Sequence, residues 1–287
     1  MFLFGGISLN ARMLFTFLKP ALVSAVLVGL CFPALSESRA ASWETTVTPF
    51  VPGAFAEARP LRARYNFGWS GIAAANAEFR FEKIGGNRLQ LEAHGGTVGV
   101  ARRLWSYDIN HTALADAGTL RPLSVKETEK FRAKEVSTDL IYSSEGVRST
   151  RDERKDGAVK TKVRRFDFPD ALSVYSALLF LRTQPLLDGA THRVVVYPAT
   201  SSYLCTVTVG GHESITVATG TYEAIKLDVQ LSKIGGKLEL LPHKKFRNAT
   251  VWLSNDADRL VLRVEAQVFV GKVFAELQSV QFDNPKP

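Results

Sequence analysis

The stretch FPDALSVYSALLFLRTQP, residues 168–185, is the one place in this chain where apolar residues recur at helical spacing. Residues three and four positions apart share one face of a helix. Two such rows lie side by side: Ala171, Val174, Leu178 and Leu181, and Leu172, Tyr175, Leu179 and Arg182. Asp170 is placed as an N-cap and Pro185 as a stop, so the pattern predicts a helix over about residues 170–183. Only Ser173, Ser176 and Thr183 stay polar, so we expect this helix to be buried on most sides.

The sequence around the helix alternates between apolar and polar residues, which is typical of strands. Tyr65, Phe67 and Trp69 share one face of the first expected strand, and the Gly-Gly-Asn turn at residues 85–87 closes the first expected hairpin. Further strands are expected at residues 104–114, 120–126, 131–142, 146–150 and 159–168 before the helix, and at 192–197, 203–209, 213–218, 222–231, 237–241, 249–253, 260–270 and 272–282 after it. The pattern predicts a mainly β fold: a large antiparallel curved sheet, sandwich or barrel with one buried helix across an opening or inside.

The first forty residues are typical of a cleavable secretory signal. Arg12 and Lys19 precede an apolar run over residues 21–32, and Ser-Arg-Ala at 38–40 is a suitable cleavage site. The alternative is an uncleaved membrane anchor, but the run is shorter than the ~20 residues that span a bilayer. We therefore expect no transmembrane segment in the mature chain. The predicted organisation is a signal peptide (1–40), a Pro-rich linker or extended arm (41–60), a single β-rich domain (61–283) and a disordered tail (284–287).

Positive charge is concentrated in the middle of the chain. The whole sequence has a net charge of +8, and removal of residues 1–40 leaves +6. Residues 121–165 contain 13 basic and 8 acidic residues, a net charge of +5. In an exported protein, the partners that such a segment favours are anionic lipid headgroups, lipopolysaccharide or acidic cell-wall polymers rather than nucleic acid. The basic surface residues singled out are Lys130, Arg132, Lys134, Arg164 and Arg165. The alternative is that these residues form the solvated face of long hairpins.

Residue patterns that would dictate a reaction are missing. The five histidines, at positions 94, 111, 192, 212 and 243, show no close metal-ligand spacing, so neither a metal nor another cofactor is predicted. Cys205 is the only mature cysteine, lies in a strand pattern and is interpreted as a small buried side chain. Asn255, Asp256 and Asp258 are interpreted as a turn between two strands rather than a calcium loop. No catalytic residue is predicted.

Aromatic and apolar side chains are the remaining candidates for a binding site. They are Trp69, Trp105, Tyr107, Tyr175, Leu178 and Leu179. Such side chains line hydrophobic clefts or stack on sugars, and the alternative is ordinary core packing.

Three segments resemble a known family. They are RYNFGWSGIAAANAEF at 64–79, Asp170 with the helix through LFLR at 179–182 and LLDG at 186–189, and ATVWLSNDADRL at 249–260. In this order they are similar to exported bacterial proteins that carry domain of unknown function 3108, over about residues 61–283. The resemblance implies a periplasmic, mostly β protein, and it supplies neither a reaction nor catalytic residues.

The sequence leaves three functions open. The first is a non-enzymatic periplasmic protein that binds a hydrophobic or lipid-like envelope component in a β-shell closed by the helix. The second is an adaptor or assembly factor of the cell envelope that binds a protein or an acidic glycan. The third is a hydrolase of envelope polymers, for which no motif is found.

Overall fold

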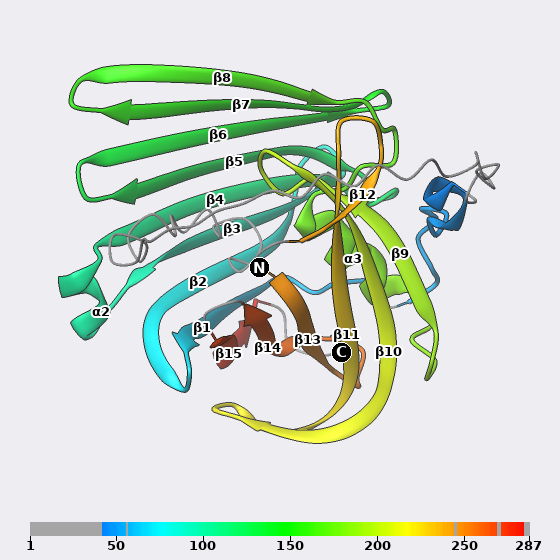
Figure 1. Cartoon of the computed structure of the whole chain (residues 1–287). Coiled ribbons are helices and arrows are strands. Elements are labelled where there is room, and N and C mark those ends of the chain that lie inside the picture. Colours follow the sequence, from blue (N-terminus) through cyan, green and yellow to red (C-terminus); the bar gives the residue numbers. More distant parts are fainter. Residues whose placement is uncertain (1–41, 56, 244–245, 269–270, 284–287) are drawn as a thin grey trace, which may run out of the picture.

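The structure is a computed structural model that describes residues 42–55, 57–243, 246–268 and 271–283. The predicted signal peptide and the predicted tail at 284–287 lie outside these residues. Within the described ranges, every strand belongs to one 15-stranded sheet (Figure 1).

The first half of the domain is a run of antiparallel hairpins in chain order. Its strands are β1 (Leu61–Trp69), β2 (Ile72–Ile84), β3 (Arg88–Thr97), β4 (Tyr107–Asp116), β5 (Pro122–Phe131), β6 (Lys134–Ser143), β7 (Gly146–Lys155) and β8 (Ala158–Phe166). Helix α2 (Gly99–Leu104) connects β3 to β4. Alternating burial along β2 to β7 follows the alternating sequence, as the pleat requires.

Helix α3 (Val174–Thr183) separates this half from the second. The strands that follow are β9 (Thr191–Val196), β10 (Ser202–Val217), β11 (Gly220–Ile234), β12 (Leu240–Pro242), β13 (Phe246–Ser254), β14 (Val261–Val268) and β15 (Gly271–Phe282). The order across the sheet is β8-β7-β6-β5-β4-β3-β2-β1-β15-β14-β13-β11-β10-β9, with β12 paired to β11. The pairing of β1 with β15 therefore joins the two halves, and β8 and β9 are the two edges.

The sheet curves around α3. Figure 1 shows β5–β8 extending as long hairpins on one side of the helix and β9–β11 curving past its other side. Tyr175 and Leu179 of the helix pack into a hydrophobic cluster with β2–β7, whereas Ala177, Phe180 and Leu181 pack into a second cluster with β9–β11, β13 and β14. The predicted mainly β fold, one large antiparallel curved sheet with a buried helix, is confirmed.

The two edge strands, β8 and β9, do not pair with each other. Three side chains from β6, β7 and β8 donate hydrogen bonds to carbonyl oxygens of the segment that follows β9. The bonds run from Tyr142 to Tyr197 at 2.7 Å, from Ser149 to Ala199 at 2.7 Å and from Arg164 to Thr200 at 2.5 Å. Side chains, and not a strand ladder, therefore connect these two parts of the shell.

The helix begins later than the sequence indicates. Ser173 is the N-cap, and its side chain accepts a hydrogen bond from the backbone of Ser176, so the prediction of Asp170 as the cap was wrong. Leu172 instead pairs with β9 through Val195 and Tyr197, and Asp170 forms an ion pair with Arg121 at 3.0 Å. Pairing with the sheet thus overrides the helical pattern at residues 170–172. The polar stripe is also buried: Ser173 and Ser176 are less than 3% exposed.

Other boundaries differ for local reasons. The strand expected from residue 104 begins at Tyr107, because residues 99–104 form α2. The strand expected at residues 131–142 begins at Lys134, because the chain turns at Arg132 with a positive φ of 53°, a turn that no glycine or asparagine announces. The Gly210-Gly211 pair is a bulge inside β10 and not the break that was expected.

The stretch that precedes the sheet, residues 42–60, contacts the domain at several points. Trp43 donates its indole N–H to the carbonyl of Leu238 at 2.6 Å, and the backbone of Gly53 donates to Thr183 Oγ1 at 3.0 Å. Phe50 packs against Phe180 of α3, with 4.9 Å between ring centroids. None of the described helices is long and apolar enough to cross a membrane.

Candidate functional site

A cavity of about 1160 Å³ lies between α3 and the concave face of the sheet. This volume exceeds the roughly 300–1,000 Å³ of a typical small-molecule pocket. Apolar side chains make most of its wall, and they come from both halves of the sheet. They include Leu61, Ala63, Tyr65, Phe67, Phe79, Phe81 and Leu91 from β1–β3, and Cys205, Val207, Leu227, Val229, Leu231, Phe246, Val251, Val264 and Ala275 from β10–β15.

Helix α3 presents a continuous apolar row to the cavity. Val174, Ala177, Leu178 and Leu181 are spaced three and four residues apart, so they share one side of the helix and line the cavity together. Tyr175 also lines it, and its hydroxyl has no hydrogen-bond partner among the described residues. Burial raises the pKa of this phenol, so it stays protonated and can donate a hydrogen bond.

One end of the cavity is strongly basic. Seven cationic side chains of β6–β8 and of the turn before β6 line it, and we call them the basic rim: Arg132, Lys134, Arg151, Lys155, Lys160, Lys162 and Arg164. The only acid of β5–β8 among the lining residues is Glu153. The strand pleat explains the set, because every second residue of β7 and of β8 points to the same face.

The basic rim is anchored by a buried polar network on the neighbouring strands β4, β5 and β6. Arg151 reaches Glu129 at 3.6 Å and Thr138 Oγ1 at 3.2 Å, and Tyr107 donates a hydrogen bond to Glu129 at 2.8 Å. Burial is the main cause that raises the pKa of Glu129, and the nearby charge of Glu127 is the second. These contacts hold the Arg151 guanidinium in place on the second strand from the edge.

Other rim cations have fewer partners. Lys134 forms an ion pair with Glu153 at 2.6 Å, and this contact lowers the pKa of the Glu153 carboxyl. Lys160 and Lys162 form no ion pair with any described residue and are exposed. The basic rim therefore has more positive charge than the protein neutralises.

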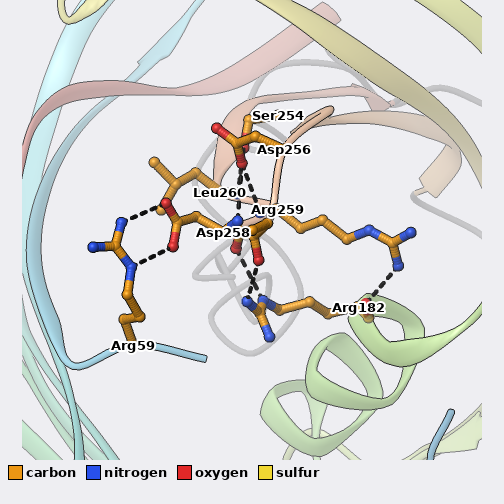
Figure 2. Close-up of polar contacts among 8 residues, drawn as sticks. Arg59, Arg182, Ser254, Asp256, Asp258, Arg259 and Leu260 are labelled. Carbon is orange, nitrogen blue, oxygen red and sulfur yellow. Dashed lines mark hydrogen bonds and ion pairs between the residues drawn. The ribbon is translucent and has the colours of Figure 1, made fainter. Parts of the chain in front are cut away.

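A second group of arginines lies at the C-terminal end of α3 (Figure 2). Arg182 donates to the carbonyls of Ala257 and Asp258, both at 2.9 Å, and Arg59 forms a two-point ion pair with Asp258 at 2.6 and 2.7 Å. Arg259 donates to the carbonyls of Arg182 and Gln184 at the end of the helix, where the last backbone carbonyls have no intrahelical donor. These arginines also line the cavity, but their donors are engaged: Arg182 and Arg259 fix the β13–β14 turn to the helix, and Arg59 fixes it to the stretch before β1.

The structure brings several of the predicted site residues together. Those that line the cavity are Trp105, Tyr175, Leu178, Leu179, Arg132, Lys134 and Arg164. Tyr107 is not part of the lining: its ring packs against Phe131, with 6.3 Å between ring centroids, and its hydroxyl donates a hydrogen bond to Glu129. Trp69 is half exposed and is not part of the lining.

Two predicted basic residues lie apart from the rim. Lys130 and Arg165 occupy alternate strand positions next to lining residues, so they point to the opposite face of the sheet. Lys130 pairs with Glu135 at 3.3 Å, and Arg165 approaches Glu145 and Asp167 at 3.8 Å.

Sequence reasoning missed the centre of the basic rim. Arg151, Lys160 and Lys162 were counted in the charged segment but not singled out. The even spacing was visible in the sequence: Arg151 lies two residues after Ser149, and Lys162 lies two residues before Arg164. The strand register then places Arg151 directly opposite Lys162. No group of three or more histidine, cysteine, aspartate or glutamate side chains suited to a metal occurs in the described part of the chain.

Comparison with known proteins assigns the family. Residues 63–278 match the model of a protein family of unknown function, DUF3108. The chain belongs to this family. No curated protein matches the sequence of this DUF3108 member.

Among solved structures, the DUF3108 fold resembles a β-barrel-like protein of domain of unknown function DUF1849 from Brucella abortus. The TM-score is 0.53 at 11% identity, over 79% of this chain and 99% of that one. Two further matches are a candidate lipoprotein from Parabacteroides distasonis (TM-score 0.31, 9% identity, 80% and 99% covered) and a candidate exported protein with a YmcC-like fold from Bacteroides fragilis (0.34, 8%, 81% and 98%). At these identities the first likeness concerns the fold alone.

Proposed function

We propose that this DUF3108 protein is a non-enzymatic periplasmic protein that binds a hydrophobic or lipid-like component of the cell envelope in its cavity. One observation carries the proposal: an apolar cavity of about 1160 Å³ in a shell whose clusters on both sides of α3 are otherwise closely packed. Protein interiors are normally filled. Apolar surface that stays in contact with water loses the stabilisation of roughly 25 cal/mol per Å² that its burial would provide. A ligand that covers this wall recovers that free energy.

The location follows from the N-terminal sequence pattern. The basic residues, the short apolar run and the cleavage motif of residues 1–40 favour export, and export places the cavity next to membrane lipids and their precursors. The predicted binding residues Trp105, Tyr175, Leu178 and Leu179 belong to this proposal as part of the wall.

Native mass spectrometry of the protein, purified after expression of the full-length chain in bacteria, tests the proposal. We expect a bound mass that organic extraction identifies as a lipid-like molecule. Leu178→Trp places a large ring in the cavity from the helix, and we expect it to remove the bound mass and to abolish the fluorescence gain of 1-N-phenylnaphthylamine. Leu187→Trp is the matched control, because Leu187 is 70% exposed and does not line the cavity.

A clean ligand-free mass together with no binding of the fluorescent probe would refute the proposal. Equal effects of the two tryptophan substitutions would also refute it, because only Leu178 lines the cavity. Circular dichroism melting of both variants measures that stability directly.

A second function, an envelope adaptor, is favoured by the β8 edge. Residues Ala158–Phe166 are exposed along almost the whole strand, and an unpaired strand edge can add a strand from another chain. In-cell crosslinking from Val163 tests it: one salt-sensitive protein or glycan partner, lost on reversal of Lys130, Arg132 and Lys134, would favour the adaptor over the lipid-binding function.

A further inference from the structure

Charged and apolar side chains lie on different parts of the cavity wall. The basic rim contributes seven positive side chains against the single carboxylate of Glu153, a formal excess of six charges. The opposite wall, on β10, β11 and β13, is apolar: Cys205, Val207, Leu227, Val229, Leu231 and Val251. Burial there raises the pKa of the Cys205 thiol to about 12, so this side chain is neutral as well. A molecule that covers both walls must itself have one charged end and one apolar end.

The strand register places cations directly opposite each other, and a bound anion would relieve their repulsion. Arg151 lies directly opposite Lys162, and Lys134 lies directly opposite Lys155. Like charges in directly opposed positions of an antiparallel pair destabilise the sheet. The single carboxylate of Glu153 pairs with Lys134 and also lies directly opposite Lys160, whereas Lys162 lies opposite a cation. The protein thus keeps an uncompensated positive field on the cavity side of β7 and β8.

Protection of a sheet edge does not explain this arrangement. Lysines on an edge strand discourage edge-to-edge aggregation, and this accounts for Lys160 and Lys162 on β8. It does not account for Arg151 and Lys134, which lie on the second and third strands from the edge with side chains only 20% and 21% exposed. Arg151 is in addition fixed by Glu129 and Thr138, as expected for a guanidinium that is held ready for a partner.

We infer that the ligand is an amphiphile with a phosphate-bearing anionic headgroup, whose headgroup contacts Arg151, Lys160 and Lys162 and whose hydrocarbon part lies against α3, β10 and β11. This inference rests on the proposed function and adds to it the headgroup class and the orientation. Guanidinium and ammonium groups are the usual partners of phosphate oxygens, and Arg151 presents the planar donor set that binds two oxygens at once.

The orientation also fits the exposure of the two ends. Lys160 and Lys162 are in contact with solvent, whereas Leu227 and Val229 are buried. A headgroup at the basic rim therefore keeps part of its hydration, and the chains lie where water is excluded. The reverse orientation would remove the phosphate from water without any uncommitted cation, because the arginines at the end of α3 donate to Asp258 and to backbone carbonyls.

Lipids that differ only in their headgroup test the inference. Dioleoyl-phosphatidylglycerol and dioleoyl-phosphatidylcholine are titrated against the full mature protein, the double variant Lys160→Glu/Lys162→Glu and the control Arg148→Glu/Arg165→Glu. The control makes the same change of charge, with one substitution on β7 and one on β8, on the opposite face of the sheet, where Arg148 pairs in register with Arg165. Two lost charge-assisted contacts predict at least a roughly tenfold weaker binding of phosphatidylglycerol to the rim variant.

The expected pattern has three parts. The wild type prefers phosphatidylglycerol to phosphatidylcholine, the rim reversal removes this preference without changing the binding of phosphatidylcholine, and the control reversal stays close to the wild type. Equal binding of both lipids to the wild type, or equal weakening by both reversals, would overturn the headgroup assignment and leave the proposed function intact. If glycerol 3-phosphate binds as tightly as the lipid, the assignment of the ligand as an amphiphile is overturned. If neither lipid binds and Leu178→Trp changes neither the bound mass nor the probe fluorescence, the proposed function itself is contradicted.

Discussion

Strands β8 and β11 both direct every second side chain into the cavity, but the side chains are of opposite character. From β8 they are Lys160, Lys162 and Arg164, and from β11 they are Leu227, Val229 and Leu231. Strand β11 lies inside the sheet with paired neighbours on both sides, whereas β8 is an edge that is exposed along almost its whole length. The same pleat therefore supplies a site with two kinds of wall, and the difference lies in the neighbours of each strand.

The filled and the hollow side of α3 provide the sharpest test of this comparison. Phe180 is fully buried between Phe50 and the β9–β11 cluster, whereas Leu178 is half-buried and lines the cavity. We expect Phe180→Ala to lower the free energy of unfolding by about 3–5 kcal/mol. Leu178→Ala should cost clearly less, because its side chain already borders open space. Urea unfolding of both variants measures the difference, and equal losses would mean that the cavity side is packed in solution.

The two groups of cations should differ in what they do for stability. Arg182→Met removes the donors of the Ala257 and Asp258 carbonyls at the end of α3, so we expect a loss of about 1.5–3 kcal/mol. Lys162→Met, at a rim position without an ion pair, should change the free energy of unfolding by less than about 0.5 kcal/mol. Thermal and urea unfolding provide both values. A rim variant as unstable as the helix-end variant would mean that Lys162 has a structural role.

The contact between the sheet edges should have an intermediate effect. Ser149→Ala removes the hydrogen bond to the carbonyl of Ala199, and we expect a loss of about 1 kcal/mol. Ser137→Ala is the matched control on neighbouring strand β6, at a position that faces away from the cavity. Hydrogen exchange of residues 197–201 should accelerate in the first variant and stay unchanged in the second. Unchanged exchange in both would contradict a stabilising role for this bond.

The smallest expected effect is a change in pH dependence. Because burial raises the pKa of Glu129, the folded chain binds this proton more tightly than the unfolded chain. The contribution of Glu129 to stability is then complete below the ordinary glutamate pKa of about 4.3 and is lost as the pH rises through the raised value. Glu129→Gln keeps an acceptor for Tyr107 and does not titrate, so the variant should gain stability relative to the wild type as the pH rises. A constant difference from acid to neutral pH would show that the carboxyl is not perturbed.

Much of the fold could be predicted because alternation is a local property. The aromatic row of Tyr65 and Phe67 and the apolar row of α3 were both visible in the sequence and both line the cavity. Boundaries failed where a tertiary contact outweighed the local pattern, as at Leu172, which pairs with β9 although it fits the helix. The turn at Arg132 has no turn-forming residue, so local chemistry does not identify it.

The candidate site was harder to predict, because it depends on which strands lie opposite each other. Trp69 and Trp105 were selected for the same reason, yet only Trp105 lines the cavity. Arg165 and Arg164 are neighbours in sequence, and the pleat alone places them on opposite faces of β8. Assigning the face required the register of β7 with β8, which in turn depends on the whole sheet.

The three hydrogen bonds that Tyr142, Ser149 and Arg164 make to residues 197–200 have a mechanical consequence. A closed barrel can be widened only by tearing a ladder of backbone bonds, whereas this shell has a seam. Parting the seam would cost roughly 0.5–1.5 kcal/mol for each neutral bond, somewhat more for the arginine bond, and in addition the apolar contacts across it, such as the stacked rings of Phe166 and Tyr197, while every strand keeps its neighbours. The seam is therefore the place where the shell can widen without the loss of any strand pairing.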